Sequence, residues 1–183
     1  MKIVLASASA ARRALLRRAG IPFDAVPSGV AEISGGPLGR TVLANAGRKA
    51  AAVSRLLPGR WVLAADTMIA FGGRIYGKPS SRKAAAGLLA RMAGRWHVLA
   101  TGVVLRRGAR IFRRVVRTRV RIRPLGLAAI RAILSRQDPT AVAGGYCIRK
   151  RNDPLIERID GSFSNVIGLP MEWMTDRLRR SVR

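Results

Sequence analysis

The chain has 183 residues, of which 49% are apolar, and its formal net charge is +26. This length suits one compact core, so we expect a single domain over residues 1–183, with two lobes at most. The one cysteine, Cys147, excludes an internal disulfide, and the one histidine, His97, excludes a histidine-rich metal site. The chemistry must therefore use carboxylates, amines, guanidinium groups, hydroxyls or a hard metal ion.

The strong positive charge predicts attraction to phosphate, whether in nucleotides, nucleic acids or anionic membranes. The basic residues occur in almost every segment, without RGG repeats, zinc-ligand spacing or interleaved aromatics. A specific nucleic-acid function is therefore possible in principle but not favoured. No apolar run approaches about 20 residues, and "MKIVLASASAARR" turns polar too early for a signal peptide, so we expect a cytoplasmic protein with no membrane segment.

The first half of the chain alternates short apolar runs with helical patterns. We expect strands at 2–7, 21–26, 61–71 and 74–77. We expect helices at 8–20, ended by Gly20, at about 40–57, and from a cap at Ser80 or Ser81 to about Met92. The segment 27–39 reads as a loop that holds one acid, Glu32.

The second half continues the same alternation. We expect strands at 97–105, 109–116 and 118–125, a helix at about 127–136, loops at 141–148 and around Asn152, and a final helix near Pro170. Strands and helices interleave without internal repeats, which indicates the α/β class.

In the run from Val116 to Arg123, apolar or hydroxyl residues alternate with arginines. This period of two is typical of a strand with one wet face. The arginines could bind a phosphate backbone, but a solvated edge face is the favoured interpretation.

Acids are scarce, and Asp66 stands out because it follows the apolar run "WVLAA". We expect it to end a strand, where ligand sites of open α/β sheets gather. A carboxylate there can hold Mg²⁺ or take a proton from water. The alternative is a turn or capping aspartate.

Two further patterns favour a phosphate site. Most basic residues are arginine, yet lysine stands at Lys49 and Lys78, and lysine offers a compact charge for one phosphate oxygen. In "LASASAARR", a strand gives way to small residues and a helix start, so backbone amides, Ser7 and Ser9 can face an anion, with Arg12 one turn inside. Taken alone, a lysine of this kind is more often a solvated side chain, and a loop of this kind is more often an ordinary capped turn from strand to helix.

Several spaced segments together resemble the Maf (septum-formation inhibitor) family of nucleoside triphosphate pyrophosphatases. They stand in the family's order between about Ile3 and Met174: "LASASAARRALL", "VAE", "KAAAV", "AADT", "GRIYGKP", "HVLATGVVL", "AGGY" and "GSFSNVIGLP".

The resemblance implies an elongated mixed α/β sheet with two lobes around a central cleft, similar to the inosine-triphosphate pyrophosphatase architecture, and a homodimer. It implies hydrolysis of a nucleoside triphosphate to the monophosphate and pyrophosphate with Mg²⁺ or Mn²⁺. By position, Asp66 matches the proton acceptor, and Glu32 with Asp66 matches the metal-associated acids. The expected phosphate and substrate contacts are Ser7, Ser9, Arg12, Lys49, Thr67, Lys78 and Arg149, of which Arg12, Lys49 and Lys78 also assist catalysis.

Some positions differ from the family pattern. Ala10 and Ala11 replace a proline and a larger residue, Ala31 replaces an acid, Val142 replaces a lysine, and Arg149 lies in the segment that reads the base. The triphosphate-handling set is thus nearly complete, whereas the base-reading set is not. We therefore expect a pyrophosphatase acting on a standard, non-standard or modified nucleotide. The alternatives are a catalytically weakened homologue that binds nucleotides or regulates division, and a basic RNA-binding module.

Overall fold

The computed structural model describes residues 2–148 and 152–181. In this part of the chain, seven strands form one sheet in the order β2-β1-β3-β5-β6-β7, and β4 pairs with β3. Strands β2 and β3 lie parallel to β1, whereas the remaining pairs are antiparallel. The strands are β1 Ile3–Leu5, β2 Phe23–Ala25, β3 Val62–Phe71, β4 Arg74–Tyr76, β5 Trp96–Arg107, β6 Arg110–Ile122 and β7 Ile156–Asp160. This mixed sheet confirms the predicted α/β class.

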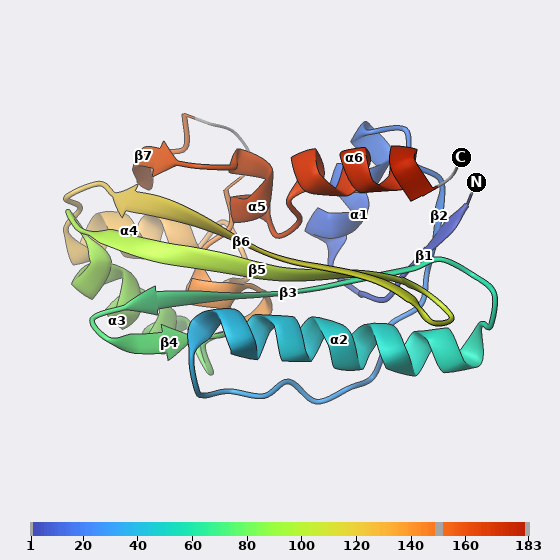
Figure 1. Cartoon of the computed structure of the whole chain (residues 1–183). Helices are drawn as coiled ribbons and strands as arrows, with labels where there is room; N and C mark the ends of the chain where they lie inside the picture. Colours follow the sequence, from blue (N-terminus) through green and yellow to red (C-terminus); the bar gives the residue numbers. More distant parts are fainter. Residues whose placement is uncertain (1, 149–151, 182–183) are drawn as a thin grey trace.

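Helices cover both faces of the sheet (Figure 1). Helix α2 runs along one face, α1, α5 and α6 lie over the other, and α3 and α4 lie together at one end. The helices are α1 Ala10–Arg18, α2 Leu38–Leu56, α3 Arg82–Met92, α4 Leu127–Leu134, α5 Phe163–Ile167 and α6 Met171–Ser181, with 3₁₀ turns η1 Pro139–Ala141 and η2 Ala143–Gly145. None of the described helices is both long enough and apolar enough to cross a membrane.

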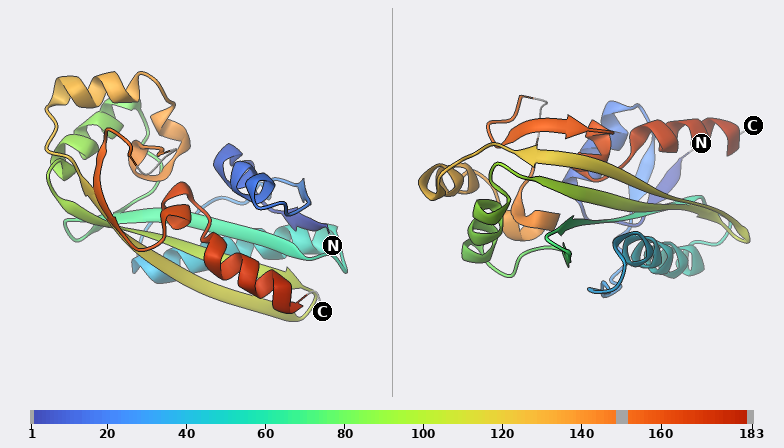
Figure 2. Two further views of the ribbon diagram at one scale, coloured as in Figure 1. Left: turned by 90° about the horizontal axis from the view of Figure 1, so that it is seen from above. Right: turned by 60° about the vertical axis from the view of Figure 1, so that its left-hand side comes forward.

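The hydrophobic core is divided along the molecule. One cluster, which includes Leu89, lies among α3, α4 and the adjoining ends of the strands. At the other end, Leu16 and Met174 belong to a cluster beneath α1 and α6, while Val53 and Val62 belong to one beneath α2. The long strands join the two ends (Figure 2). This division agrees with the expected elongated, two-lobed architecture.

Most predicted elements are confirmed to within a few residues, including the alternation in β6, where Thr118 and Val120 are buried and Arg117 and Arg119 are exposed. The expected strands 109–116 and 118–125 are one strand, β6. Strand β7 and helix α5, which have five residues each, were not predicted. Elements this short depend on packing against their neighbours rather than on a periodic pattern.

A close contact between α2 and β5 prepares the site. A Cβ atom at Gly102 would lie 2.4 Å from the carbonyl oxygen of Val42 in α2, so only glycine allows this approach. Gly102 is the register partner of Asp66 in the neighbouring strand. The inner face of α2 is thereby brought down beside Asp66.

Candidate active site

Asp66 lies in the middle of β3 and not at its carboxyl end, so the expectation that it ends a strand is wrong. The apolar run continues as "TMIAF" after the acid, and pairing with β5 extends from Val62 to Ala70. The strand that does end here is β1, which pairs with β3 only at Val62 and Leu63. Asp66 therefore lies beside the carboxyl end of β1, where ligand sites in α/β sheets gather.

An opening in the edge of β3 makes this position accessible. The edge opposite β5 is paired with β1 up to Leu63 and with β4 from Ile69 onward. Between Leu63 and Ile69, none of the described strands pairs with this edge of β3. Asp66 and Thr67 lie in this unpaired interval. Alternate side chains point to opposite faces of a sheet, so groups from both faces can meet around the open edge.

Lys49 joins two acids at this opening. Its Nζ lies 2.6 Å from Oε1 of Glu32 and 2.7 Å from Oδ1 of Asp66. Lys49 comes from the inner face of α2, and it and Asp66 are 7% and 3% exposed. Burying charges costs free energy unless they are paired and hydrogen-bonded, so this triad holds its geometry firmly.

Asn45, one turn before Lys49, is a site residue that the sequence analysis missed. Its Nδ2 donates to Oδ2 of Asp66 and to the carbonyl oxygen of Ile33, both at 3.0 Å. Its Oδ1 accepts from the Ile33 backbone amide at 2.8 Å. Asn45 thus fastens the loop that carries Glu32 to the carboxylate of Asp66. Its spacing of four residues from Lys49, on the same helix face, is the signal that could have revealed it.

The electrostatics favour the ionised form of Glu32. Partial burial alone would raise the pKa of this carboxyl, but the hydrogen bond from Lys49 and the positive charges of Lys49, Lys78 and Arg12 together lower it. Glu32 is therefore a carboxylate at neutral pH.

Arg12 lies on the other side of the opening. Its Nε donates to the carbonyl oxygen of Gly168 at 2.8 Å, Nη1 to Ser7 and Nη2 to Thr67 at 3.1 Å. Burial lowers the pKa of Arg12, whereas the charges of Asp66 and Glu32 oppose that change. The "SNVIG" segment thus holds Arg12 within the field of both acids.

The two serines of the first loop are engaged locally. Ser9 is the N-cap of α1 and accepts from the Arg12 amide, while the Ser7 hydroxyl accepts from the Ser9 amide at 3.2 Å. Thr67 lies 3.0 Å from Thr101, hydroxyl to hydroxyl. Ser7 and Thr67 therefore orient Arg12, and Ser9 caps the helix. Direct contact of these three hydroxyls with substrate stays a prediction.

Lys78, in the turn after β4, approaches the carboxylate of Glu32. Its Nζ lies 3.8 Å from Oε1 of Glu32, and its side chain is half exposed. The glycine loop that precedes Tyr146 supports this turn, because the amide of Gly144 donates to the carbonyl oxygen of Gly77. Gly145 has a φ of +78° and packs against Pro79, so a side chain there would be strained.

The described residues in and around the glycine loop are not part of the Lys49 site. Tyr146 is a core residue whose hydroxyl lies 2.7 Å from Nε2 of His97, and burial lowers the pKa of that histidine to about 4, so it is neutral at pH 7. Ile148 is buried in the same core, and Val142 is half-buried beside η2. Arg149, expected to contact the base, lies outside the described residues. These positions are therefore not part of the described site.

Two carboxylates could hold a metal ion. Mg²⁺ in nucleotide enzymes takes one or two carboxylates and completes its shell with phosphate oxygens and water. Glu32 and Asp66, both bound to one lysine, supply such a pair. The described residues contain no group of three or more His, Cys, Asp or Glu side chains that could hold a metal on its own. This donor set therefore fits an ion shared with a phosphate ligand.

Known proteins are similar to this chain over almost its whole length. The family model described as Maf, Maf-like protein, matches residues 2–181. A dTTP/UTP pyrophosphatase of Pelotomaculum thermopropionicum is 37% identical, covering 98% of this chain and 96% of the relative. A dTTP/UTP pyrophosphatase of Thermomicrobium roseum is 41% identical, covering 97% and 83%. A nucleoside triphosphate pyrophosphatase of Rhodopseudomonas palustris is 42% identical, covering 92% and 88%. The chain belongs to the Maf family.

Proposed function

We propose that this protein hydrolyses a nucleoside triphosphate to the monophosphate and pyrophosphate. The observation that carries the proposal is the buried Lys49 between Glu32 and Asp66. Arg12 lies within the electrostatic field of both acids, and Lys78 lies 3.8 Å from Glu32. Family membership and the names of the relatives, all pyrophosphatases of nucleoside triphosphates, support it.

The basic residues would bind the triphosphate and neutralise the leaving pyrophosphate. Lys78 is the exposed member and meets the phosphates first, while Lys49 shifts part of its interaction from the carboxylates to a phosphate oxygen. Arg12 stays anchored at Gly168 and supplies fixed charge. Preorganised charges of this kind stabilise the charge that develops in phosphoryl transfer.

Asp66 would orient the attacking water and accept its proton. Asn45 keeps hold of Oδ2, and the shift of Lys49 towards phosphate frees Oδ1 for the water. General-base catalysis by a positioned carboxylate contributes about 10²–10⁴-fold to rate. The site needs no covalent nucleophile.

Glu32 and Asp66 would hold Mg²⁺ or Mn²⁺ together with the phosphates. The bound ion supplies charge neutralisation on the phosphate oxygens. Glu32, the more exposed of the two acids, is the principal candidate for this contact.

For the base, we place dTTP and UTP first. The names of several relatives give these substrates, whereas those from Rhodopseudomonas palustris name nucleoside triphosphates in general. Two residues, Ala11 and Arg149, depart from the family pattern for reading the base. Non-standard or modified nucleotides are therefore further candidates. A cytoplasmic homodimer is the proposed state of the protein.

The test is pyrophosphate release from a panel of nucleotides with Mg²⁺, run in water labelled with oxygen-18. We expect label in the monophosphate, since water attacks the α-phosphorus, and fastest turnover of dTTP or UTP. Release of orthophosphate, or label in pyrophosphate, would contradict the proposed reaction. Nucleotide binding without turnover of any panel member would favour the alternative of a weakened, binding homologue.

A further inference from the structure

A groove of about 520 Å³ lies between α2 and the β5–β6 hairpin, away from the candidate active site. Its floor is apolar and includes Leu43, Val104 and Ile111. Its rim is basic: the charged lining residues are Arg40, Arg48, Arg106 and Arg113. The groove thus combines an apolar floor with four arginines in its lining.

The charge of this groove has no local compensation. Helix α2 and strands β5 and β6 contain no Asp or Glu, and the whole chain has no acid between Asp66 and Asp138. Farther along β6, Arg119 and Arg121 do have acidic partners, Asp160 and Glu157 of β7. Within the described residues, the groove arginines form no ion pair.

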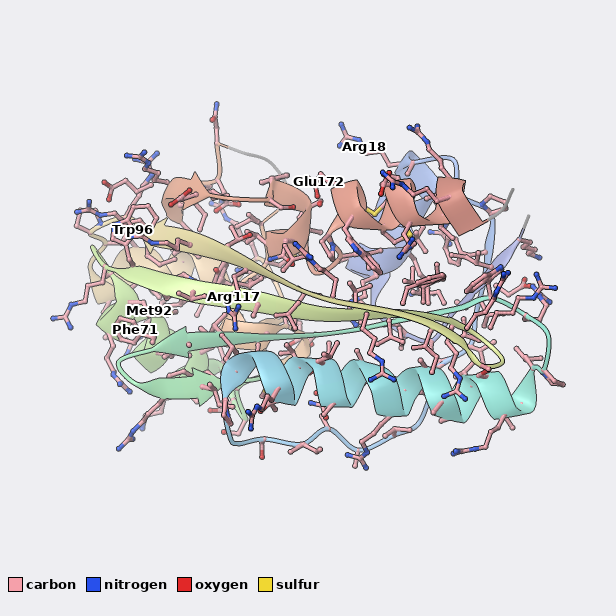
Figure 3. All side chains as sticks on the ribbon, viewed as in Figure 1. Arg18, Phe71, Met92, Trp96, Arg117 and Glu172 are labelled. Atoms are coloured by element: carbon pink, nitrogen blue, oxygen red, sulfur yellow. The ribbon has the colours of Figure 1, made fainter. Side chains whose placement is uncertain are left out.

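The arginines continue beyond the groove as a line. Arg117 lies four residues after Arg113 on the same face of β6, about 13 Å along the strand, with Val115 between them. Arg117 reaches the beginning of α2, where a Cβ atom added to Gly39 would lie 2.7 Å from Nη2. Figure 3 shows this side chain between the sheet and that helix end. A linear row of charges matches a chain of phosphates better than a single phosphate group.

We propose that the groove and the adjoining row of arginines bind single-stranded nucleic acid. Guanidinium groups bind phosphate oxygens through two donors and also stack on bases, and the apolar floor accepts the face of a base. A recess between a helix and a hairpin admits a strand, whereas a membrane surface contacts groups that protrude. This inference is independent of the proposed hydrolysis, because it uses no residue of the Lys49 site.

Fluorescence anisotropy of a labelled oligothymidylate over a salt series tests the proposal. The double variant Arg106→Gln/Arg113→Gln should bind at least about 10-fold more weakly than the parent. Its slope of log K against log salt should be shallower by about 0.7 for each phosphate that the variant no longer neutralises. The matched control is Arg18→Gln/Arg179→Gln, which removes the same charge from exposed residues of α1 and α6, the helices on the other face of the sheet (Figure 1). It should stay within about twofold of the parent, as should Lys78→Ala.

Three results would overturn the proposal. Equal weakening by both double variants would show that binding follows net charge alone. Loss of binding in Lys78→Ala would place the oligonucleotide in the active site. Binding of polyglutamate or phosphatidylglycerol vesicles that depends on Arg106 and Arg113, without binding of the oligonucleotide, would assign the groove to another class of partner.

Discussion

The two faces of α2 carry positive charge in opposite ways. On the inner face, Lys49 is buried and paired with Glu32 and Asp66. On the outer face, Arg40 and Arg48 are exposed, and neither is paired with an acid among the described residues. The same helix thus carries a lysine paired with acids on its inner face and, on its outer face, arginines that have no acidic partner among the described residues.

The difference shows how each surface can work. A buried charge must have partners, so Lys49 is held in one geometry that suits chemistry on a small ligand. An exposed charge needs none, and it stays free to exchange counterions for phosphate. The hydrogen bond from Arg48 to the carbonyl oxygen of Ala31, next to Glu32, links the two faces.

Removing the buried cation should have the largest effect on stability. Lys49→Met leaves Asp66 and Glu32 without their shared partner, and breaking a buried ion pair costs about 3–5 kcal/mol. Chemical denaturation should show this loss. Lys78→Met is the control, because Lys78 contacts the same Glu32 oxygen but is exposed, and it should cost less than about 1 kcal/mol. Similar losses in both variants would contradict the importance of burial.

Lifting α2 from the sheet should disturb both of its faces. A methyl group at Gly102 would meet the backbone of Val42, and we expect Gly102→Ala to cost about 3 kcal/mol, the upper part of the range for overpacking. The control is Gly87→Ala in α3, where nothing lies near the new methyl group and helix propensity should add about 0.5–1 kcal/mol. A stabilised Gly102→Ala variant would mean that α2 does not lie this close.

Asn45→Leu should separate positioning from folding. The loss of hydrogen bonds to Asp66 and to the Ile33 backbone should lower stability by about 1–2 kcal/mol. Because Asp66 and the Glu32 loop lose their common anchor, kcat should fall more than KM rises. A variant with parental kcat and reduced stability would restrict Asn45 to a structural role.

The smallest expected effect is on the pH dependence of stability. The folded-state pKa of Glu32 lies below its ordinary value of 4.5, so its ion pair contributes fully above about pH 4.5 and is lost as pH falls through the folded value. Since the Glu32 side chain is 38% exposed and solvent screens its charge, Glu32→Gln should cost less than about 1 kcal/mol at pH 7. The difference in Tm between parent and variant should narrow below pH 4.5. A difference that grows in acid would contradict this sign.

The sequence was sufficient for the elements with strong patterns and for the proximity of three residues within family motifs. Asp66, Lys49 and Glu32 were expected in one site, and the structure brings them together. The position of Asp66 within β3 was not predictable, because the opening beside it arises from where β1 ends and β4 begins. The spacing of Asn45 from Lys49 indicates only a shared helix face, whereas its contact with Asp66 also depends on the close approach of α2 at Gly102.

The most direct test of the central claim is single-turnover pyrophosphate release by Asp66→Asn, with nucleotide affinity measured separately. If Asp66 activates the water, the rate should fall by about 10²–10⁴-fold while the nucleotide still binds. A rate equal to that of the parent would contradict the assignment of this site as the centre of hydrolysis.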